Sequence, residues 1–506
     1  MDLVPWRRIP MSGVAVTAFF FLVALPRPAI PLIDGDVWWH IRAGEQVLRT
    51  GAVPRVDTWS IVGAGMPWTS QDWLSNVGVA LGHRLGDLGP TTLSVGFSLL
   101  VVAALLLLWR GIGLRDPRAA WLARIVWLAA GLTVAGPVVG VRVQVVDLPL
   151  AAASLVVAWA YLGHRRPLIL ACLPVIAVAW ANLHAGWPLL FLLVGAVGIG
   201  EALDRLARRA VEPEPLGWGH LGWLGVALLV SAVGIALNPN GVDLYAYPIE
   251  TSSIAAHRDF LAEWAPPDIG SFPGQVLAGF LLLGVLPTLV LAWRRLRTGD
   301  LLILVGMTIM AVSSARFLLV AGPIASAVVA IGLAPWLSST RVGRALGPTL
   351  ERMARGPTRT GASINLALAT MLAVAGLAVT VARVSPAAQE QAIAEHMPVA
   401  AVDWIVANDP GDRPFNTYSW GGYLGLRRTD TPVYIDGRSD IYGDGPIRAY
   451  ADAISLRTDP SSLLDEHAID HVIFNTDHAF ADWLDDQAEW RRAYSDPMAS
   501  VWVRSR

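Results

Sequence analysis

Long apolar runs separated by short polar segments make up most of the first 383 residues. A helix needs about 20 apolar residues to cross a bilayer core of about 30 Å. Runs of this kind predict eleven membrane-spanning helices, at residues 12–30, 91–109, 121–139, 145–162, 168–183, 187–203, 219–237, 273–293, 301–316, 317–336 and 362–382. As one helix, the 36 residues of 301–336 would extend about 54 Å. We therefore expect a hairpin turn at 313–316, and a similar turn at 182–186.

The polar segments between these runs alternate in charge. Segments 1–11, 110–120, 163–167, 204–218, 294–300 and 338–361 hold 18 arginines, of which Arg7 and Arg8 precede the first run. Segments 31–90 and 238–272 together hold five arginines against eleven carboxylates. Because basic residues are retained on the cytoplasmic side, the alternation predicts a cytoplasmic N-terminus. Eleven spans then place residues 384–506 on the outer face.

Overall composition agrees with a membrane protein. The chain is 54% hydrophobic and 15% charged, with a mean hydropathy of +0.50, whereas soluble domains are about 25% charged. This excludes a soluble enzyme and a disordered chain. A net charge of −2 argues against a nucleic-acid partner, and the single cysteine, Cys172, excludes a disulfide framework. All 38 basic residues are arginine, a composition typical of GC-rich bacterial genomes, so we expect a bacterial plasma membrane.

The last segment, 384–506, is different from the rest. It contains 20 Asp and Glu against 10 Arg, which indicates an acidic soluble domain. Strand-like stretches at 432–435, 471–474 and 500–503 alternate with helix-like stretches at 446–457, 460–468 and 479–494. Strands spaced by helices predict a small α/β layer. The predicted organisation is a mostly α-helical polytopic membrane domain, 1–383, followed by an extracytoplasmic α/β domain, 384–506.

The first outer loop, 31–90, concentrates polar and aromatic side chains directly after the first span. A helix over 36–48 would place Asp36 and His40 on one face and Glu45 on another. Tryptophans are typical of the membrane interface, and Asp72 and Trp73 continue the pattern further along the loop. One interpretation is an ordinary interfacial amphipathic helix whose acidic residues cap its start. The other is a functional site.

The motifs of this loop resemble those of the GT-C glycosyltransferase superfamily. The resemblance lies in Asp34-x-Asp36-x-Trp38-Trp39-His40, Thr50-Gly51-x-x-Pro54-x-x-Asp57-x-x-Ser60, Pro67-Trp68 and Asp72-Trp73-Leu74. It extends to Trp180-Ala181-Asn182-Leu183-His184, Asn238-Pro239-Asn240-Gly241, Glu263-Trp264, Trp420-Gly421-Gly422-Tyr423 and Tyr434-Ile435-Asp436-Gly437-Arg438. The superfamily includes protein mannosyltransferases, aminoarabinose transferases and oligosaccharyltransferases. The resemblance implies a membrane glycosyltransferase with a polyprenyl-phosphate sugar as donor. The Trp-Gly-Gly-Tyr segment lacks the aspartate of the oligosaccharyltransferase motif Trp-Trp-Asp-Tyr-Gly, which argues against a peptide acceptor.

Such an enzyme needs a base for the acceptor hydroxyl, positioned within about 3 Å of it. Asp34 is the first candidate for the base. Asp36 is a second base or, together with Asp34, a ligand of Mg²⁺ or Mn²⁺, since an open two-carboxylate site suits these ions.

The leaving polyprenyl phosphate needs cationic or hydrogen-bonding partners. Ionisable groups at membrane depth are functional candidates by default, which selects Arg142, His184 and Arg316. Arg316 could instead snorkel to the headgroups, and His184 could bond the backbone at its hairpin turn.

The remaining candidates are polar and aromatic residues on loops, where binding residues collect. As substrate-binding residues the sequence suggests His40, Glu45, Asp72, Trp73, Asn182, Glu263, Trp420, Tyr423, Asp436 and Arg438. Asn182 could equally cap a helix end, and Asp436-Gly437 could be only a turn at the end of a strand. The loop 238–272 could hold the sugar or the acceptor, or it could be only a packing loop rich in turn formers. Besides Glu263 it carries Asn238, Asn240, Asp243, Tyr245, Tyr247, His257 and Trp264, and the polar and aromatic cluster of the tail also contains Asn416, Tyr418, Asp440 and Tyr442.

The sequence thus predicts a GT-C-type glycosyltransferase that moves a sugar from a polyprenyl-phosphate donor to a glycan, lipid or protein acceptor, with lipid-linked sugar and membrane lipids as partners. Two rival functions remain. A transporter or lipid flippase would place polar residues near the bilayer midplane, whereas the centres of these spans are almost free of charged residues. A non-catalytic cell-envelope assembly protein would use the tail to bind a partner.

Overall fold

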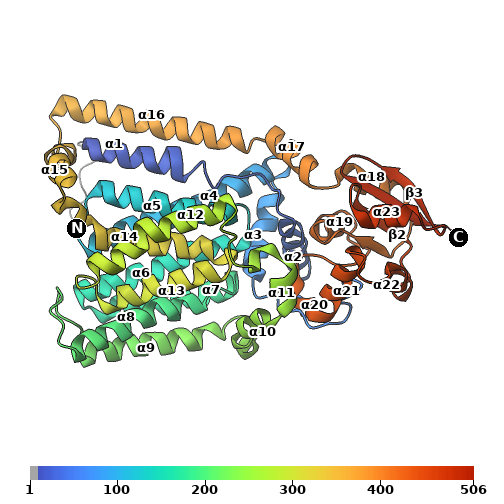
Figure 1. Cartoon of the computed structure of the whole chain (residues 1–506), viewed down its shortest axis with the longest axis horizontal. Coiled ribbons are helices and arrows are strands. Elements are labelled where there is room, and N and C mark those ends of the chain that lie inside the picture. The colour runs from blue at the N-terminus through green and yellow to red at the C-terminus, as the bar shows by residue number, and fades with distance from the viewer. Residues whose placement is uncertain (1–8, 506) are drawn as a thin grey trace.

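The computed structural model describes residues 9–505. A bundle of long helices forms one part of the molecule (Figure 1). Its helices are α1 (Met11–Ala18), α4 (Gly89–Arg115), α5 (Trp121–Ala135), α6 (Asp147–His164), α7 (Cys172–Leu183), α8 (Pro188–Leu206), α9 (Trp218–Ile235), α12 (Phe272–Phe280), α13 (Thr298–Ser313), α14 (Leu318–Ser339) and α16 (Arg359–Arg383). Each predicted span overlaps one of these helices, and both predicted hairpin turns are present.

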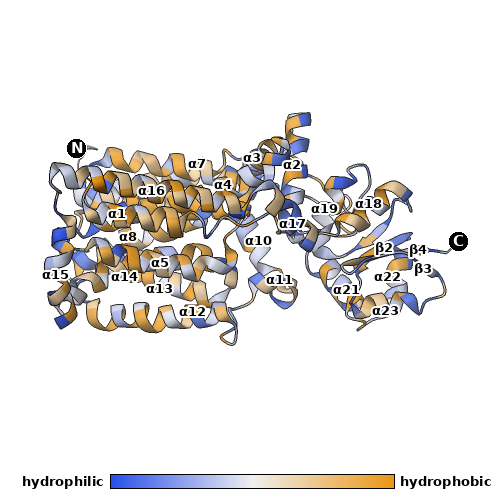
Figure 2. Cartoon of the chain, turned by 90° about the horizontal axis from the view of Figure 1, so that it is seen from above, coloured by the Kyte–Doolittle hydropathy of each residue, from blue (hydrophilic) through white to orange (hydrophobic). Residues whose placement is uncertain are grey.

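Seven helical segments within residues 9–505 are long and apolar enough to cross a membrane. They are Gly86–Arg115, Trp121–Val138, Val143–His164, Trp218–Ile235, Phe272–Ala292, Ala315–Trp336 and Thr360–His396. Met11–Ala24, Pro167–Leu183 and Thr298–Ser313 are apolar but shorter, and α8 ends in a charged turn. The bundle is mainly hydrophobic along its length (Figure 2). The protein is therefore a polytopic α-helical membrane protein, as predicted.

The first helix is shorter than the expected span 12–30. It continues beyond α1 as a π-helical turn to Ala24, and Pro26 and Pro28 follow directly. Proline cannot donate the backbone hydrogen bond that would extend the helix, so the chain leaves the helix early. Arg7 and Arg8 lie outside the described residues.

Helices of the loops gather at the two ends of the bundle. The short helix α15 (Arg341–Ala354) lies at the end where the described chain begins, whereas α2 (Asp36–Thr50), α3 (Trp73–His83), α10 (Tyr247–Ser253) and α11 (Ala255–Phe260) lie at the opposite end, beside the C-terminal region (Figure 1). The amphipathic helix expected over 36–48 is therefore present as α2. The two predicted outer loops share one end with the tail, as the charge alternation requires, while the orientation in the membrane stays a prediction.

The tail folds as a small α/β layer, as expected. Strands β1 (Pro414–Asn416), β2 (His471–Asn475), β3 (Trp490–Ser495) and β4 (Ala499–Arg504) form a sheet in the order β1-β2-β4-β3. The pair β1–β2 is parallel and the other two pairs are antiparallel. The helices are α17 (Pro386–His396), α18 (Val399–Asn408), α19 (Gly421–Arg427), α20 (Ser439–Tyr442), α21 (Asp444–Ile454), α22 (Pro460–Glu466) and α23 (Ala479–Asp485). The domain boundary at 383/384 stays a prediction.

Two expectations for the tail were wrong. The helix expected over 479–494 ends at Asp485, and its second half becomes β3, because pairing with β4 satisfies its backbone there. The stretch 432–435 is not a strand of the sheet. Instead, the N–H of Val433 donates to the carbonyl of Trp59 at 2.8 Å, and the N–H of Ile61 donates to the carbonyl of Val433 at 2.8 Å. The tail therefore pairs with the first loop.

A shared hydrophobic cluster joins the first loop to the tail. It includes Trp39, Trp59 and Trp68 from the loop and Tyr434 and Tyr442 from the tail. The rings of Trp59 and Trp68 meet edge to face, with centroids 4.8 Å apart. The tryptophans of the loop are thus part of the core of the C-terminal region, and this packing positions the site described next.

Candidate functional site

A polar cavity of about 120 Å³ lies where the first loop, the bundle and the tail meet. Eight of the residues selected from the sequence line it: Asp34, Asp36, His40, Asp72, Arg142, His184, Glu263 and Arg316. Gly437, Ser439 and Asp440 of the tail complete its wall. Three segments that are far apart in sequence therefore build one site.

A second, mainly apolar cavity of about 370 Å³ adjoins the first. The two share residues, among them Gln144, His184, Trp264 and Arg316. The rest of its wall consists largely of apolar side chains of α8, α13 and α14 and the turn between the last two: Leu189, Leu192, Met310, Phe317, Leu319 and Val320. A molecule with a polar head and an apolar tail would fit across the junction.

Arg142 joins two carboxylates in the polar cavity. Its guanidinium lies 2.5 Å from Oδ2 of Asp34 and 2.8 Å from Oε2 of Glu263. Arg142 was predicted to bind phosphate, but here its charge is balanced by carboxylates on both sides. This contact fixes the position of the Asp34 carboxylate.

Asp36 is in a different environment, although it is only two residues away. Its N–H donates to Oδ1 of Asp34 at 2.9 Å, and the indole N–H of Trp39 donates to Oδ1 of Asp36 at 3.2 Å. Burial, followed by the charges of Asp34 and Glu263, raises the pKa of Asp36 well above its usual value. The raised pKa favours the protonated form of Asp36, which cannot take up a further proton, so Asp34 is the better candidate for a base.

His40 and Asp72 form a third group on the cavity wall. Nδ1 of His40 lies 2.6 Å from Oδ1 of Asn76 and 3.3 Å from Oδ2 of Asp72. Burial lowers the pKa of His40 to about 3 and raises the pKa of Asp72 to about 6. Asp36 and His40 line the same cavity, as their spacing on one helix predicted.

Arg316 and His184, at the junction of the cavities, are held differently. Arg316 makes no ion pair with a described carboxylate, and its guanidinium carbon lies 4.0 Å from the ring centre of Trp264. Nδ1 of His184 lies 2.8 Å from Oδ2 of Asp147, which also accepts from the indole N–H of Trp180 at 2.7 Å through its other oxygen. A buried carboxylate, not the backbone, therefore orients His184.

Several predicted substrate-binding residues do not reach the polar cavity. Glu45 makes an exposed ion pair with Arg84 at 2.6 Å. Trp73 donates its indole N–H to Oδ1 of Asn182 at 2.8 Å, which ties α3 to α7. Trp420 and Tyr423 also lie outside that cavity, and the Tyr423 ring packs on Trp38 with centroids 5.0 Å apart.

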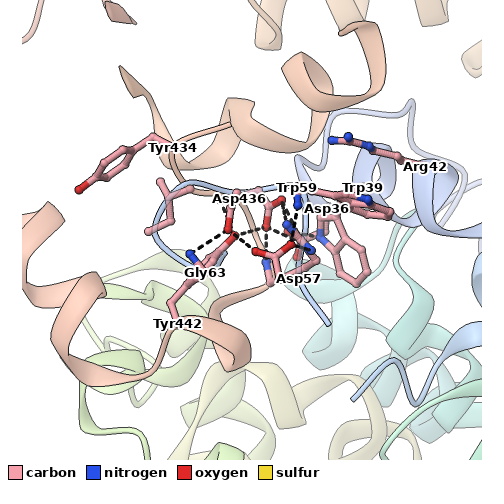
Figure 3. Close-up of polar contacts among 12 residues, drawn as sticks. Asp36, Trp39, Arg42, Asp57, Trp59, Gly63, Tyr434, Asp436 and Tyr442 are labelled. Atoms are coloured by element: carbon pink, nitrogen blue, oxygen red, sulfur yellow. Dashed lines mark hydrogen bonds and ion pairs between the residues drawn. The ribbon is translucent and has the colours of Figure 1, made fainter. Parts of the chain in front are cut away.

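Asp436 and Arg438 lie behind the cavity wall. Arg438 donates to Asp436 at 2.7 Å and to Asp57 at 2.8 Å, and the hydroxyl of Tyr442 donates to Asp436 at 2.7 Å (Figure 3). Arg438 is 1% exposed, and its guanidinium carbon lies 4.8 Å from the Trp59 ring. Asp436 and Arg438 bond each other and Asp57, and they are buried, so they connect the tail to the first loop. Their neighbours Gly437 and Ser439 line the cavity.

Other cavity residues were not among the individually selected site residues. The hydroxyl of Tyr247 donates to Oδ2 of Asp440 at 3.0 Å, across 193 positions of sequence. Burial raises the pKa of Asp440 to about 6. Gln144 and His257 also line the cavity. Each belongs to a polar loop, but only the fold shows that these loops meet.

The metal site predicted at Asp34 and Asp36 stays a prediction. Among residues 9–505, no group of three or more His, Cys, Asp or Glu side chains is arranged to hold a metal ion. Arg142 already provides a positive charge between Asp34 and Glu263. Asp34 and Asp36 alone do not make up such a group, and Arg142 is the charge partner of Asp34 in this arrangement.

Comparison with solved structures identifies the fold. The chain is similar to the oligosaccharyltransferase of Archaeoglobus fulgidus in its apo form, with a TM-score of 0.55 and 14% identity over 92% of this chain and 69% of the other. The same enzyme tethered to an acceptor peptide containing the NVT sequon gives 0.54 and 13% identity, over 98% of this chain and 74% of the other.

ArnT from Cupriavidus metallidurans bound to undecaprenyl phosphate gives a TM-score of 0.51 and 14% identity, over 97% of this chain and 96% of the other. No protein-family model matches the sequence, and no curated protein matches it either. The similarity covers both the helical bundle and the tail. The chain therefore has the fold of the GT-C membrane glycosyltransferases, as the motifs of its first loop implied.

Proposed function

We propose that the protein is a membrane glycosyltransferase that moves a sugar from a polyprenyl-phosphate donor to a hydroxyl of an acceptor. The observation that carries this proposal is Arg316, a cation without an ion pair to a described carboxylate, at the junction of a polar and an apolar cavity. A polyprenyl phosphate has the matching shape, with one anionic group at the end of a long apolar chain. ArnT, a structural neighbour, is bound to undecaprenyl phosphate.

In this proposal the two cavities bind different parts of the donor. The lipid occupies the apolar cavity between α8, α13 and α14. Its phosphate binds Arg316, with His184 and Gln144 as further hydrogen-bonding partners on the same wall. The sugar then lies in the polar cavity, beside Asp34.

Asp34 acts as the general base in the transfer step. It takes the proton of the acceptor hydroxyl as the oxygen attacks the anomeric carbon, while the bond from that carbon to the phosphate oxygen breaks. Arg142 holds Asp34 in position, and Arg316 stabilises the charge of the departing phosphate. A single displacement inverts the anomeric centre. A double displacement would normally need two carboxylates about 5 Å apart with one as nucleophile, and the raised pKa of Asp36 makes it a poor nucleophile.

The proposal also includes the location. The arginine distribution favours a cytoplasmic N-terminus, so the cavity and the tail would face the outer side of a bacterial plasma membrane. The acceptor is a glycan, a lipid or a protein. The mechanism above does not use a divalent metal, which stays a prediction.

The test is transfer of radiolabelled sugar from a panel of polyprenyl-phosphate sugars by the purified protein in lipid. Asp34→Asn should lower transfer by about 10²–10⁴-fold, the usual contribution of a general base. Glu45→Gln is the matched control, because Glu45 is also paired with an arginine on the first loop but lies outside the cavity. Full activity of Asp34→Asn would refute its role, and an EDTA lane tests the metal.

The panel also separates the rival functions. No transfer by a folded protein across the panel would favour the transporter or the cell-envelope assembly protein. Loss of function on changing Asp34, with the tail untouched, would favour the enzyme over the assembly protein.

A further inference from the structure

His257 is a buried polar side chain that the proposed mechanism does not use. It lies on α11, is 0% exposed and lines the polar cavity. Neither ring nitrogen has a hydrogen-bond partner within residues 9–505. Backbone groups of Ser439 and Thr251 lie close enough to favour the protonated ring, but neither meets hydrogen-bonding geometry. Since buried polar groups are almost always hydrogen-bonded, the two nitrogens point to a ligand of the cavity.

The helix that carries His257 is held against the tail by two contacts. The N–H of Ala256 donates to Oδ1 of Asp444 at 2.6 Å, and Asp259 pairs with Arg448 at 2.5 Å. Both partners belong to α21 of the tail. The imidazole is therefore held against the cavity by the packing of α11 on the tail, so that it is already in place when a ligand enters.

The surroundings of His257 keep the ring neutral. Burial lowers its pKa below the usual value, and the charge of Arg316 lowers it further, against the nearby backbone groups. The imidazole packs on Trp264 with ring centroids 4.7 Å apart, and the same indole lies under the Arg316 guanidinium. A neutral imidazole has one N–H donor and one nitrogen acceptor.

The donor and the acceptor nitrogen of the neutral His257 ring together indicate which kind of ligand can bind there. A phosphate only accepts hydrogen bonds and would leave the acceptor nitrogen without a partner. An ammonium group only donates and would leave the N–H without a partner. A hydroxyl both donates and accepts, so a sugar ring, which carries hydroxyls on several sides, can satisfy two nitrogens that face in different directions. The aromatic face of Trp264 next to the imidazole suits the apolar side of such a ring.

A second polar pair lies on the same side of the cavity. Asp440 accepts from the hydroxyl of Tyr247 through Oδ2, and both residues line the cavity together with His257. We propose that His257, Tyr247 and Asp440 form a subsite that binds the hydroxyl groups of a sugar ring and decides which sugar is accepted. The inference rests on the proposed function, because a sugar must enter this cavity.

Binding measurements with the full chain in lipid nanodiscs test the subsite. The probes are bare undecaprenyl phosphate and the same lipid carrying glucose, mannose or galactose, together with the three methyl glycosides as mimics of an acceptor. The variants are His257→Phe, which removes both nitrogens, and His257→Gln, which keeps a donor and an acceptor. His83→Phe is the matched control, because His83 lies on α3 outside both cavities.

The wild type should bind at least one sugar-loaded lipid more tightly than bare undecaprenyl phosphate, or should bind at least one methyl glycoside. His257→Phe should weaken that probe by about 5- to 150-fold, the loss expected for a buried hydrogen bond, and leave bare undecaprenyl phosphate unchanged. His257→Gln should recover part of the loss. If the methyl glycosides show the effect, the ring belongs to the acceptor; if the loaded lipids show it, the ring belongs to the donor.

The subsite is refuted if His257→Phe changes no probe, if it weakens bare undecaprenyl phosphate equally, or if no sugar improves binding to the wild type. Arg316→Ala reports on the proposed function separately, since it should weaken bare and loaded lipid alike. A dependence on His257 without a dependence on Arg316 would therefore overturn the lipid-phosphate part of the proposed function and keep the sugar subsite.

Discussion

Replacing Arg438 by methionine should destabilise the attachment of the tail to the first loop. The change removes a buried guanidinium that donates to Asp436 and Asp57 and leaves both carboxylates buried. Removing one partner of a buried ion pair typically costs about 3–5 kcal/mol. The planar group also lies 4.8 and 4.7 Å from the rings of Trp59 and Trp68, a contact that methionine replaces only in part.

The effect of Arg438→Met should depend on pH. In the wild type, burial raises the pKa of Asp436 but Arg438 more than offsets it, so the pKa lies below its usual value. Stability from this group is therefore present above the unfolded pKa and is lost as the pH falls through the folded one. Without Arg438 the hydrogen bond from Tyr442 remains, but burial is the largest effect on Asp436 and favours the protonated carboxyl. The stability difference between wild type and variant should therefore shrink as the pH falls from 7 towards 4.

Thermal unfolding followed by tryptophan fluorescence measures this difference. Arg84→Met is the control, because Arg84 also pairs with a carboxylate of the first loop but is exposed, and an exposed pair contributes about 0–1 kcal/mol. A variant in which Arg438, Asp57 and Asp436 are all replaced by uncharged residues should recover part of the stability. If Arg438→Met costs no more than Arg84→Met, or if its cost is the same at pH 4 and pH 7, the reasoning is wrong.

Two further changes probe the cavity wall. Asp440→Asn should stabilise the protein at pH 7.5 and have little effect at pH 4. The pKa of the Asp440 carboxyl is raised to about 6, so its ionisation destabilises the fold as the pH rises from about 4 to 6. Unfolding measured at several pH values checks this prediction. Gly437→Ala should reduce sugar transfer, because a Cβ there would lie 1.7 Å from Oδ1 of Asp36; Gly445→Ala, where a Cβ meets nothing within 4 Å, should be neutral in the same assay, and equal effects would contradict the argument.

The parts of the structure that follow local pattern could be predicted from the sequence. Apolar runs of the right length placed the helices of the bundle, and the four-residue spacing of Asp36 and His40 placed both on the cavity face of α2. The same helix carries Glu45 on another face, where it pairs with Arg84. Its selection as a binding residue rested on charge and motif, neither of which shows the direction in which a side chain points.

Contacts between distant segments could not be predicted in this way. Tyr247 and Asp440 are 193 positions apart, and no periodicity relates them. Asp436 and Arg438 resembled loop residues of a binding site, because buried and exposed ion pairs look the same in a sequence. Likewise, the residues 490–495 have the composition of a helix end, and only the neighbouring β4 makes them a strand.

The link between Asp57 and Arg438 has a consequence for biogenesis. The two residues are separated by 381 positions. At a synthesis rate of roughly 5–20 residues per second, Asp57 is made roughly 20–75 s before its partner. During that interval the tryptophans of the first loop lack the surface that later buries them, and the cavity lacks the wall formed by Ser439 and Asp440. A truncated or nascent chain would therefore contain an inserted bundle with an unfinished cavity, so that the proposed sugar transfer requires a nearly complete chain.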